Sequence, residues 1–216
     1  MNVLIIIPTR NRQKLLLERS LHSARHQDFS DYEILIIDDA SDEKYQIPDE
    51  PNIFHARSDK RLGLAAVRNL GAGLAFGEYI VSLDDDNALH HDFLKKTVRF
   101  LDARPEFDAV GVGKVVVYPE GRVYQHPPDG SFFSINDGFL MRRAAFLEVR
   151  CDPQMTANED ADFGLRFLAR HRVGRIDEPL MTVYGSAIVN KSSYSDYSDR
   201  HLDGFCRFWQ KNAAAL

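Results

Sequence analysis

The sequence has few cysteines and no long apolar segment. Its 216 residues include 2 cysteines, Cys151 and Cys206, which are too few for a disulfide framework and lack the spacing of a metal site. The chain begins without the basic leader of a signal peptide, and its first apolar run stops at Pro8. No apolar run is long enough to span a bilayer. We therefore expect a protein of the reducing cytoplasm without a transmembrane segment.

An excess of positive charge is also missing. The formal net charge is -5, which predicts no general attraction to nucleic acid or to an anionic membrane. Hydrophobic residues make up 44% and charged residues 27% of the chain, as in ordinary globular proteins. The sequence shows no internal repeat and no linker, so we expect a single domain covering residues 1–216.

Glycine is absent from the loop where many phosphate-binding folds need it. The first predicted strand is followed by Pro8-Thr9-Arg10-Asn11-Arg12. The chain also lacks a Gly-x-x-x-x-Gly-Lys-Ser/Thr motif, which excludes a P-loop NTPase. Gly71 and Gly73 lie late in a helical pattern rather than at a strand-to-helix turn, so they do not form a dinucleotide fingerprint.

The first half of the chain alternates short apolar runs with amphipathic segments. The predicted strands are Val3–Ile7, Glu33–Ile37, Ile53–Phe54 and Tyr79–Leu83, and the predicted helices are 15–24 and 63–76, the second capped by Gly77. This order predicts an α/β fold with a mostly parallel central sheet, right-handed crossovers and flanking helices. Ligands bind such sheets at the carboxyl ends of the strands.

The second half of the chain is less regular. Its pattern predicts a helix over 92–104, strands over 110–118, 121–124, 132–141 and 173–183, a helix that begins at Asn158 as its N-cap, and a short amphipathic helix over 201–209. The polar segment 190–199 is rich in serine and tyrosine and predicts a mobile loop.

The fourth predicted strand ends in three adjacent carboxylates, Asp84-Asp85-Asp86. Such groups repel one another and resist burial unless something positive neutralises them. Mg²⁺ or Mn²⁺, which prefer oxygen ligands, would do so. Because alternate residues of an extended chain share a face, we expect Asp84 and Asp86 to point one way and Asp85 the other, which makes Asp85 the most replaceable. The alternative is a solvated acidic turn that caps the next helix.

Two other predicted strands end in similarly polar sequences, Thr9-Arg10-Asn11-Arg12 and Asp38-Asp39. Since the carboxyl ends of parallel strands meet at one edge of a sheet, we expect these groups to lie beside the acidic triplet. Together they predict a binding site.

These segments resemble the inverting, family-two type of glycosyltransferase with the GT-A fold. The resemblance covers Ile5 to about Arg166 and fades after Val183. It rests on five segments, which are specific because they occur together in the family's order: Ile6-Ile7-Pro8-Thr9-Arg10-Asn11-Arg12, Ile36-Ile37-Asp38-Asp39-Ala40-Ser41, Ala66-Val67-Arg68-Asn69-Leu70-Gly71, Gly77-Glu78-Tyr79-Ile80-Val81-Ser82-Leu83-Asp84-Asp85-Asp86 and Asn158-Glu159-Asp160.

The resemblance implies metal-dependent transfer of one sugar from a nucleotide-sugar, expected to be a UDP-sugar, to a hydroxyl of a glycan, lipid-linked or other acceptor. It implies a nucleotide-binding half at 1–87, an acceptor half at 88–183 and a flexible loop with a C-terminal helix at 184–216. The implied roles are nucleotide binding by Pro8, Thr9, Arg10, Arg12, Asp39, Arg68, Asp84 and Asp85, ligation of Mn²⁺ or Mg²⁺ by Asp86, general base catalysis by Asp160, and acceptor-side positions for Glu159 and Asp137.

The chemistry agrees with these roles. A metal stabilises the diphosphate charge that grows as the sugar-phosphate bond breaks, and a carboxylate must take the proton of the acceptor hydroxyl. Other roles stay open for several residues. Arg68 could be a surface residue, Glu159-Asp160 could cap a helix, Asp162 could replace Asp160 as the base, and Arg10 and Arg12 could be solvated.

The sequence also departs from the family. Many relatives have a histidine after the last core strand, where this chain has Tyr184 to Lys191 without one, so Asn190 or Lys191 would have to substitute. The Gln-x-x-Arg-Trp signature of processive synthases is absent, which favours transfer of a single sugar.

Two rival functions remain. A sugar nucleotidyltransferase would need a glycine-rich first loop, and a non-catalytic nucleotide-sugar binding module would not need Asp160. The aromatic residues of the C-terminal helix leave association with the inner face of the membrane as an alternative to a purely cytoplasmic location.

Overall fold

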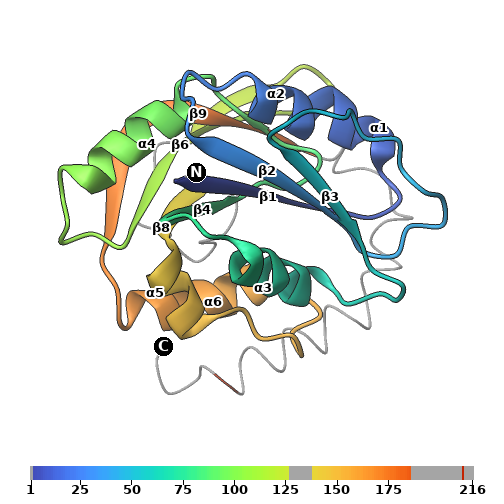
Figure 1. The fold of residues 1–216 in the computed structure, drawn as a ribbon. Coiled ribbons are helices and arrows are strands. Elements are labelled where there is room, and N and C mark those ends of the chain that lie inside the picture. Colours follow the sequence, from blue (N-terminus) through green and yellow to red (C-terminus); the bar gives the residue numbers. More distant parts are fainter. Residues whose placement is uncertain (1, 127–137, 186–210, 212–216) are drawn as a thin grey trace.

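The computed structural model describes residues 2–126, 138–185 and 211. Its centre is a nine-stranded sheet with the order β3-β2-β1-β4-β8-β6-β9-β5, to which β7 is added beside β6 (Figure 1). Helices cover both faces of this sheet, so the predicted α/β class is confirmed.

The first half of the chain forms the parallel part of the sheet. It contains β1 (Val3–Thr9), β2 (Tyr32–Asp38), β3 (Ile53–Arg57) and β4 (Tyr79–Ser82), and each neighbouring pair among them is parallel. In this register Thr9 pairs with Asp38, and Ile6 pairs with Ser82 just before the acidic triplet. The three polar strand ends therefore meet at one edge, as the sequence predicted.

The second half adds strands of both directions. β8 (Phe139–Arg142) is antiparallel to β4 and to β6 (Ala109–Val117), and β9 (Val173–Tyr184) is parallel to β6. β7 (Val123–His126) forms a hairpin with β6, and the two-residue β5 (Ala88–Leu89) pairs antiparallel with β9. These pairings place the end of β9 near the segment that follows the acidic triplet.

Two layers of helices bury the sheet (Figure 1). One face carries a continuous helical segment made of α1 (Gln13–Leu15), the π-helical turn η1 (Leu16–Ser20) and α2 (Leu21–Arg25), together with α4 (Phe93–Asp102). The other face carries α3 (Leu64–Leu74), α5 (Arg143–Val149) and α6 (Glu159–Leu168).

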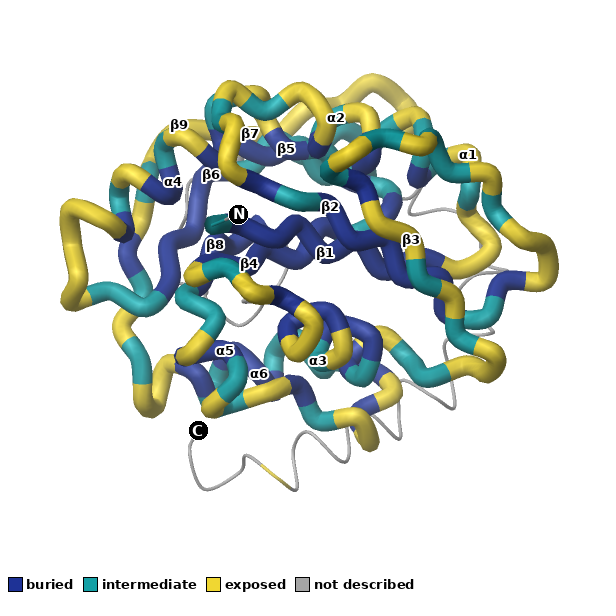
Figure 2. Tube along the Cα trace, in the orientation of Figure 1, coloured by how far each residue is buried: buried dark blue, intermediate teal, exposed yellow. Residues whose placement is uncertain are grey.

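Strand β1 lies in the sheet between the two helix layers, and every one of its residues is buried (Figure 2). Val3, Ile5 and Ile7 pack towards α2 and α4, whereas Leu4 and Ile6 pack towards α3 and α6. This two-sided burial explains why the strand is continuously apolar rather than alternating.

Several local predictions need correction. α3 ends at Leu74 because Ala75 is already extended, with ψ of 141°, and Gly77 is not its cap. Asn158 precedes α6 in a left-handed conformation and makes no side-chain capping hydrogen bond. β5 and α5 were not predicted. The predicted helix over 201–209 and the loop over 190–199 lie outside the described residues. Within the described ranges, no helix combines the length and apolar character needed to cross a membrane.

Candidate active site

A pocket of about 360 Å³ opens at the carboxyl ends of β1, β2 and β4. Pro8, Thr9, Arg10, Arg12, Asp39, Asp84, Asp85 and Asp86 all line it, so the structure brings together nearly all the nucleotide-side residues predicted from the sequence. Arg61, Gly63, Leu64 and Val67 complete the lining, although the sequence had not predicted them as site residues. The glycine that opens α3 was the signal that could have found this wall.

The acidic triplet does not follow the alternation of a strand. β4 ends at Ser82, and Asp85 and Asp86 lie in a turn. Asp85 is buried, where its carboxylate accepts a hydrogen bond from the Thr9 hydroxyl (2.7 Å) and one from Arg12 (3.1 Å). The expectation that Asp85 points away from Asp84 and Asp86 is therefore wrong, because all three line the pocket. That Asp85 is the most replaceable of the three stays a prediction. Burial raises the pKa of Asp85, while Thr9 and Arg12 oppose this rise.

Two arginines divide the three carboxylates between them. Arg12 donates from the same Nη1 atom to Asp85 and to Asp86, the latter at 2.8 Å. Arg68 donates to Asp84 at 3.0 Å. Arg12 thus has a defined role beside the acidic triplet, whereas Arg10 is exposed at the rim of the pocket.

Asp39 ties the loop before α3 to the end of β2. Its two carboxylate oxygens accept the backbone N–H groups of Leu62 (2.6 Å) and Gly63 (3.0 Å). Gly63 has φ of +90°, a conformation that favours glycine. Because a carboxylate has about four acceptor positions, these two bonds leave Asp39 able to accept from a ligand in the pocket.

The neighbouring Asp38 has a structural role. It is fully buried, pairs with Arg57 at 3.0 Å, and accepts the backbone N–H of Ser41 at 2.9 Å. Asp38 does not line the pocket, so of the two adjacent aspartates only Asp39 is placed to meet a ligand.

Arg68 does not line the pocket, in contrast to the prediction that it sits against the nucleotide. It is buried on α3 and donates to the Ser82 hydroxyl (3.2 Å), to Asp84 and to Glu159 (2.9 Å). These bonds connect the first turn of α6 with a carboxylate that lines the pocket.

The first turn of α6 contains Glu159, Asp160 and Asp162. Glu159 is occupied by Arg68, while Asp160 is partly exposed and accepts the N–H of Ala161 at 2.8 Å. Asp162 is fully buried and pairs with Arg166 and with Lys211. The alternative that Asp162 serves as a base is therefore disfavoured, because it has no exposed surface and two cationic partners.

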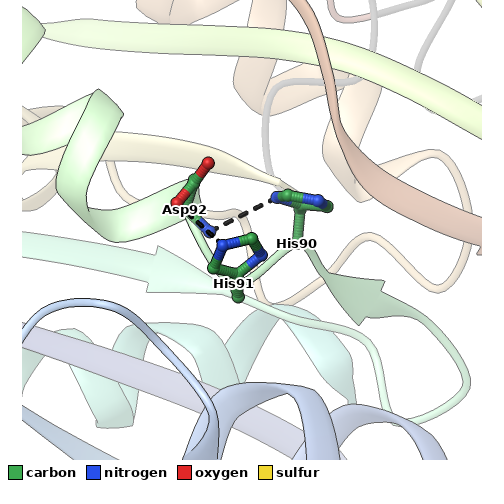
Figure 3. Close-up of side chains that lie close together, drawn as sticks. All are labelled: His90, His91 and Asp92. Atoms are coloured by element: carbon green, nitrogen blue, oxygen red, sulfur yellow. Dashed lines mark hydrogen bonds and ion pairs between the residues drawn. The ribbon is translucent and has the colours of Figure 1, made fainter.

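The oxygen donors of the pocket fit a hard divalent cation but do not form a complete cage. Among the described residues, the group of three ligand atoms that lie within reach of one ion is His90, His91 and Asp92, at the start of α4 (Figure 3). These residues do not line the pocket. The His91 ring pairs with Asp92 at 3.1 Å, as expected for surface histidines at a helix start. An ion at Asp86 would therefore need oxygen ligands from a bound diphosphate as well.

Asp137 and the two candidates for the missing family histidine, Asn190 and Lys191, lie outside the described residues.

The known proteins that this chain resembles are glycosyltransferases. The sequence model described as "Glycosyl transferase family 2" matches residues 4–158. The chain is 38% identical to the glycosyl transferase WcaA of Escherichia coli (strain K12), whose name refers to colanic acid biosynthesis, over 96% of this chain and 84% of that protein. It is 24% identical to the amylovoran biosynthesis glycosyltransferase AmsB of Erwinia amylovora, over 75% of this chain and 62% of that one.

Solved structures with the same fold include two glycosyltransferases. Residues 1–349 of Staphylococcus aureus TarS, in complex with UDP-GlcNAc, superpose with a TM-score of 0.71 at 20% identity, over 90% of this chain and 61% of that one. The mannosyltransferase PcManGT from Pyrobaculum calidifontis, in complex with GDP-Man and Mn²⁺, gives 0.68 at 18% identity, over 99% and 64%. The chain thus spans less than two thirds of the length of both structures.

Proposed function

Because this chain belongs to glycosyl transferase family 2 and is a glycosyltransferase of the GT-A type, we propose that it transfers one sugar from a UDP-sugar to an acceptor hydroxyl with metal dependence and inversion. One observation carries the proposal. The pocket lined by Asp39 and Asp86 is joined through Arg68 to the turn of α6 that contains Asp160. A donor site and a carboxylate base are thereby held by separate parts of the chain.

On the donor side, the pocket offers groups suited to a nucleoside diphosphate. Asp39 can accept a hydrogen bond from the base, while Arg10 and Arg12 line the pocket as cations for the phosphates. Asp86 would hold the Mn²⁺ or Mg²⁺ ion. When bound, the ion stabilises the negative charge that develops on the departing diphosphate.

On the acceptor side, Asp160 would take the proton of the attacking hydroxyl. A hydroxyl is a poor nucleophile at neutral pH, and an adjacent carboxylate makes it reactive as the new bond forms. If this base lies on the face of the sugar opposite the diphosphate, attack occurs in line and inverts the anomeric carbon.

The comparisons support the choice of substrates in outline. TarS structures contain UDP and UDP-GlcNAc, which favours a UDP-sugar, whereas PcManGT contains GDP-Man and makes GDP-mannose the main competitor. The names of WcaA and AmsB refer to the biosynthesis of colanic acid and of amylovoran. We propose a glycan or lipid-linked glycan acceptor, and a reaction in the cytoplasm or at the inner face of the membrane.

The test is the variant Asp160→Asn, which removes the base and keeps the size of the side chain. We expect transfer to fall by about 10²–10⁴-fold, the usual contribution of a general base, with the Kd for the donor unchanged. Asp177→Asn is the control because that side chain is 83% exposed on β9. An active Asp160→Asn variant would mean that another residue is the base. If the wild type and Asp177→Asn neither hydrolysed nor transferred any nucleotide-sugar, a non-catalytic binding module would be favoured.

A further inference from the structure

We propose that Arg68 is a positioning residue that aligns the base-bearing turn of α6 with the donor pocket, rather than a ligand of the nucleotide. This inference rests on the proposed function and adds a role that the family resemblance does not imply. It predicts that Asp84 and Glu159, which contact Arg68 from different elements, act on the reaction as a coupled pair.

The geometry of Arg68 excludes direct donor binding in this conformation. Its Nε, Nη1 and Nη2 atoms donate to Ser82, Glu159 and Asp84, respectively. Only 3% of its side chain is exposed. Because the side chain is buried, a phosphate or base could reach the guanidinium only if the groups packed around it moved apart. Breaking its ion pairs with Asp84 and Glu159 in the process would be costly.

The same hydrogen bonds fix the orientation of α6. Glu159 and Asp160 are consecutive in a helix, so their side chains leave the axis about 100° apart. When Arg68 holds Glu159, Asp160 must project from a different side of the first turn. A planar guanidinium that bonds two carboxylates at once constrains direction as well as distance.

Arg68 is itself held in place by its surroundings. Its α3 neighbour Asn69 donates to the carbonyl of Cys151 and accepts its N–H, which links α3 to the segment that leads to α6. Ser82 ends β4 directly before the pocket. Movement of Arg68 would therefore disturb both sides of the site together.

The central experiment is a double-mutant cycle with Glu159→Gln and Asp84→Asn, in the full chain and with UDP-sugar and Mn²⁺. We expect Glu159→Gln to lower kcat while the Kd for the donor stays within about twofold, because the donor pocket keeps all its lining groups. Asp84→Asn should weaken donor binding. The loss of kcat/KM in the double variant should differ from the product of the single losses by a factor of about 2 to 150, the range for residues in one network.

Two controls separate this role from others. Glu178→Gln makes the same chemical change at an exposed glutamate that pairs with Lys96, and it should leave kcat unchanged. Arg68→Lys keeps the charge without the planar fork, and it should lower kcat while the Kd for the donor stays within about twofold. Independent losses in the cycle, or a Glu159→Gln variant that loses donor affinity as much as kcat, would overturn the proposal.

Failure of the proposed function would look different. If the wild-type protein showed no transfer, the same cycle would be measured in the free energy of unfolding. If the two substitutions had coupled effects on the free energy of unfolding but no transfer occurred, Arg68 would link Asp84 and Glu159 without the proposed reaction. If their effects on unfolding were independent, Arg68 would not link the two carboxylates.

Discussion

At the scale of single residues, two arginine side chains supply part of the positive charge that the acidic triplet needs. Arg12 pairs with Asp85 and Asp86, and Arg68 pairs with Asp84 and Glu159, so two guanidinium charges face four carboxylates. The two arginines differ in how far they are exposed to solvent. The Arg12 side chain is 51% exposed, so its ion pairs are screened by water and contribute little to stability. A divalent cation could therefore displace Arg12 from Asp86 at small cost, while Arg68 stays in place.

The variant Asp86→Ala tests the metal site. We expect the Mn²⁺-dependent part of UDP affinity to disappear, because the ion loses the carboxylate that holds it in the pocket. The measurement is calorimetric titration with UDP, with and without Mn²⁺. Asp177→Ala, at an exposed site, should retain the full effect of Mn²⁺. If UDP affinity in Asp86→Ala still rises with Mn²⁺ as in the wild type, the ion is bound by other residues.

At the scale of elements, the close approach of α3 to β1 positions much of the site. α3 carries Arg68 and contributes Leu64 and Val67 to the pocket wall. The approach depends on Gly71, where an added Cβ would lie 2.6 Å from Cγ2 of Ile6. Ile6 is buried and branched at Cβ, so it has little freedom to move aside.

Gly71→Ala should therefore destabilise the protein by about 1–3 kcal/mol, because the added methyl group overpacks the contact. Gly73 provides a matched control two residues along the same helix. A Cβ at Gly73 has no heavy atom within 4 Å, so Gly73→Ala should stabilise by about 0.5–1 kcal/mol through helix propensity. Chemical unfolding measures both. Equal effects of the two substitutions would contradict the packing argument.

At the scale of the whole molecule, the parallel and the mixed parts of the sheet position different groups of the proposed site. The parallel strands β1, β2 and β4 bring donor-side groups to one edge, and the mixed second half positions α6 beside it. Asp137, which the family resemblance implies for the acceptor side, is outside the described residues. The described residues therefore contain more of the proposed donor site than of the proposed acceptor site.

Donor identity should appear as thermal stabilisation, because a ligand that binds only the folded state raises the melting temperature. At 100 times its Kd, the correct nucleotide-sugar with Mn²⁺ should add about 2.7 kcal/mol, or about 5–11 °C for a domain of this size. We expect UDP-sugars to give the largest shift. A larger shift with GDP-mannose would reverse the proposed donor, and the Asp86→Ala variant should lose the Mn²⁺-dependent part of any shift.

The parts of the fold that could be predicted are those with local signals. The β-branched runs of β1 and β2 and the polar groups after them were visible in the sequence, and the pocket forms where they meet. The antiparallel insertion of β8 between β4 and β6 was not, because strand pairing over such separations leaves no mark in local periodicity.

The errors at the site have similar causes. The alternation rule failed for Asp85 because the strand had already ended at Ser82. Arg68 was assigned to the nucleotide because its partners could not be seen from its own neighbourhood. The two carboxylates that hold it are 16 and 91 residues away in the chain.

That separation also has a consequence for the order of folding. Strands β1 to β4 and helix α3 are complete well before α6 leaves the ribosome, since synthesis runs from the N-terminus. Until the chain reaches Glu159, the guanidinium of Arg68 has the carboxylate of Asp84 but lacks that of Glu159. Contacts of such long sequence separation are closed late, because they carry the largest loop-closure entropy. The part of the molecule that contains the pocket would thus complete these ion pairs only when α6 docks.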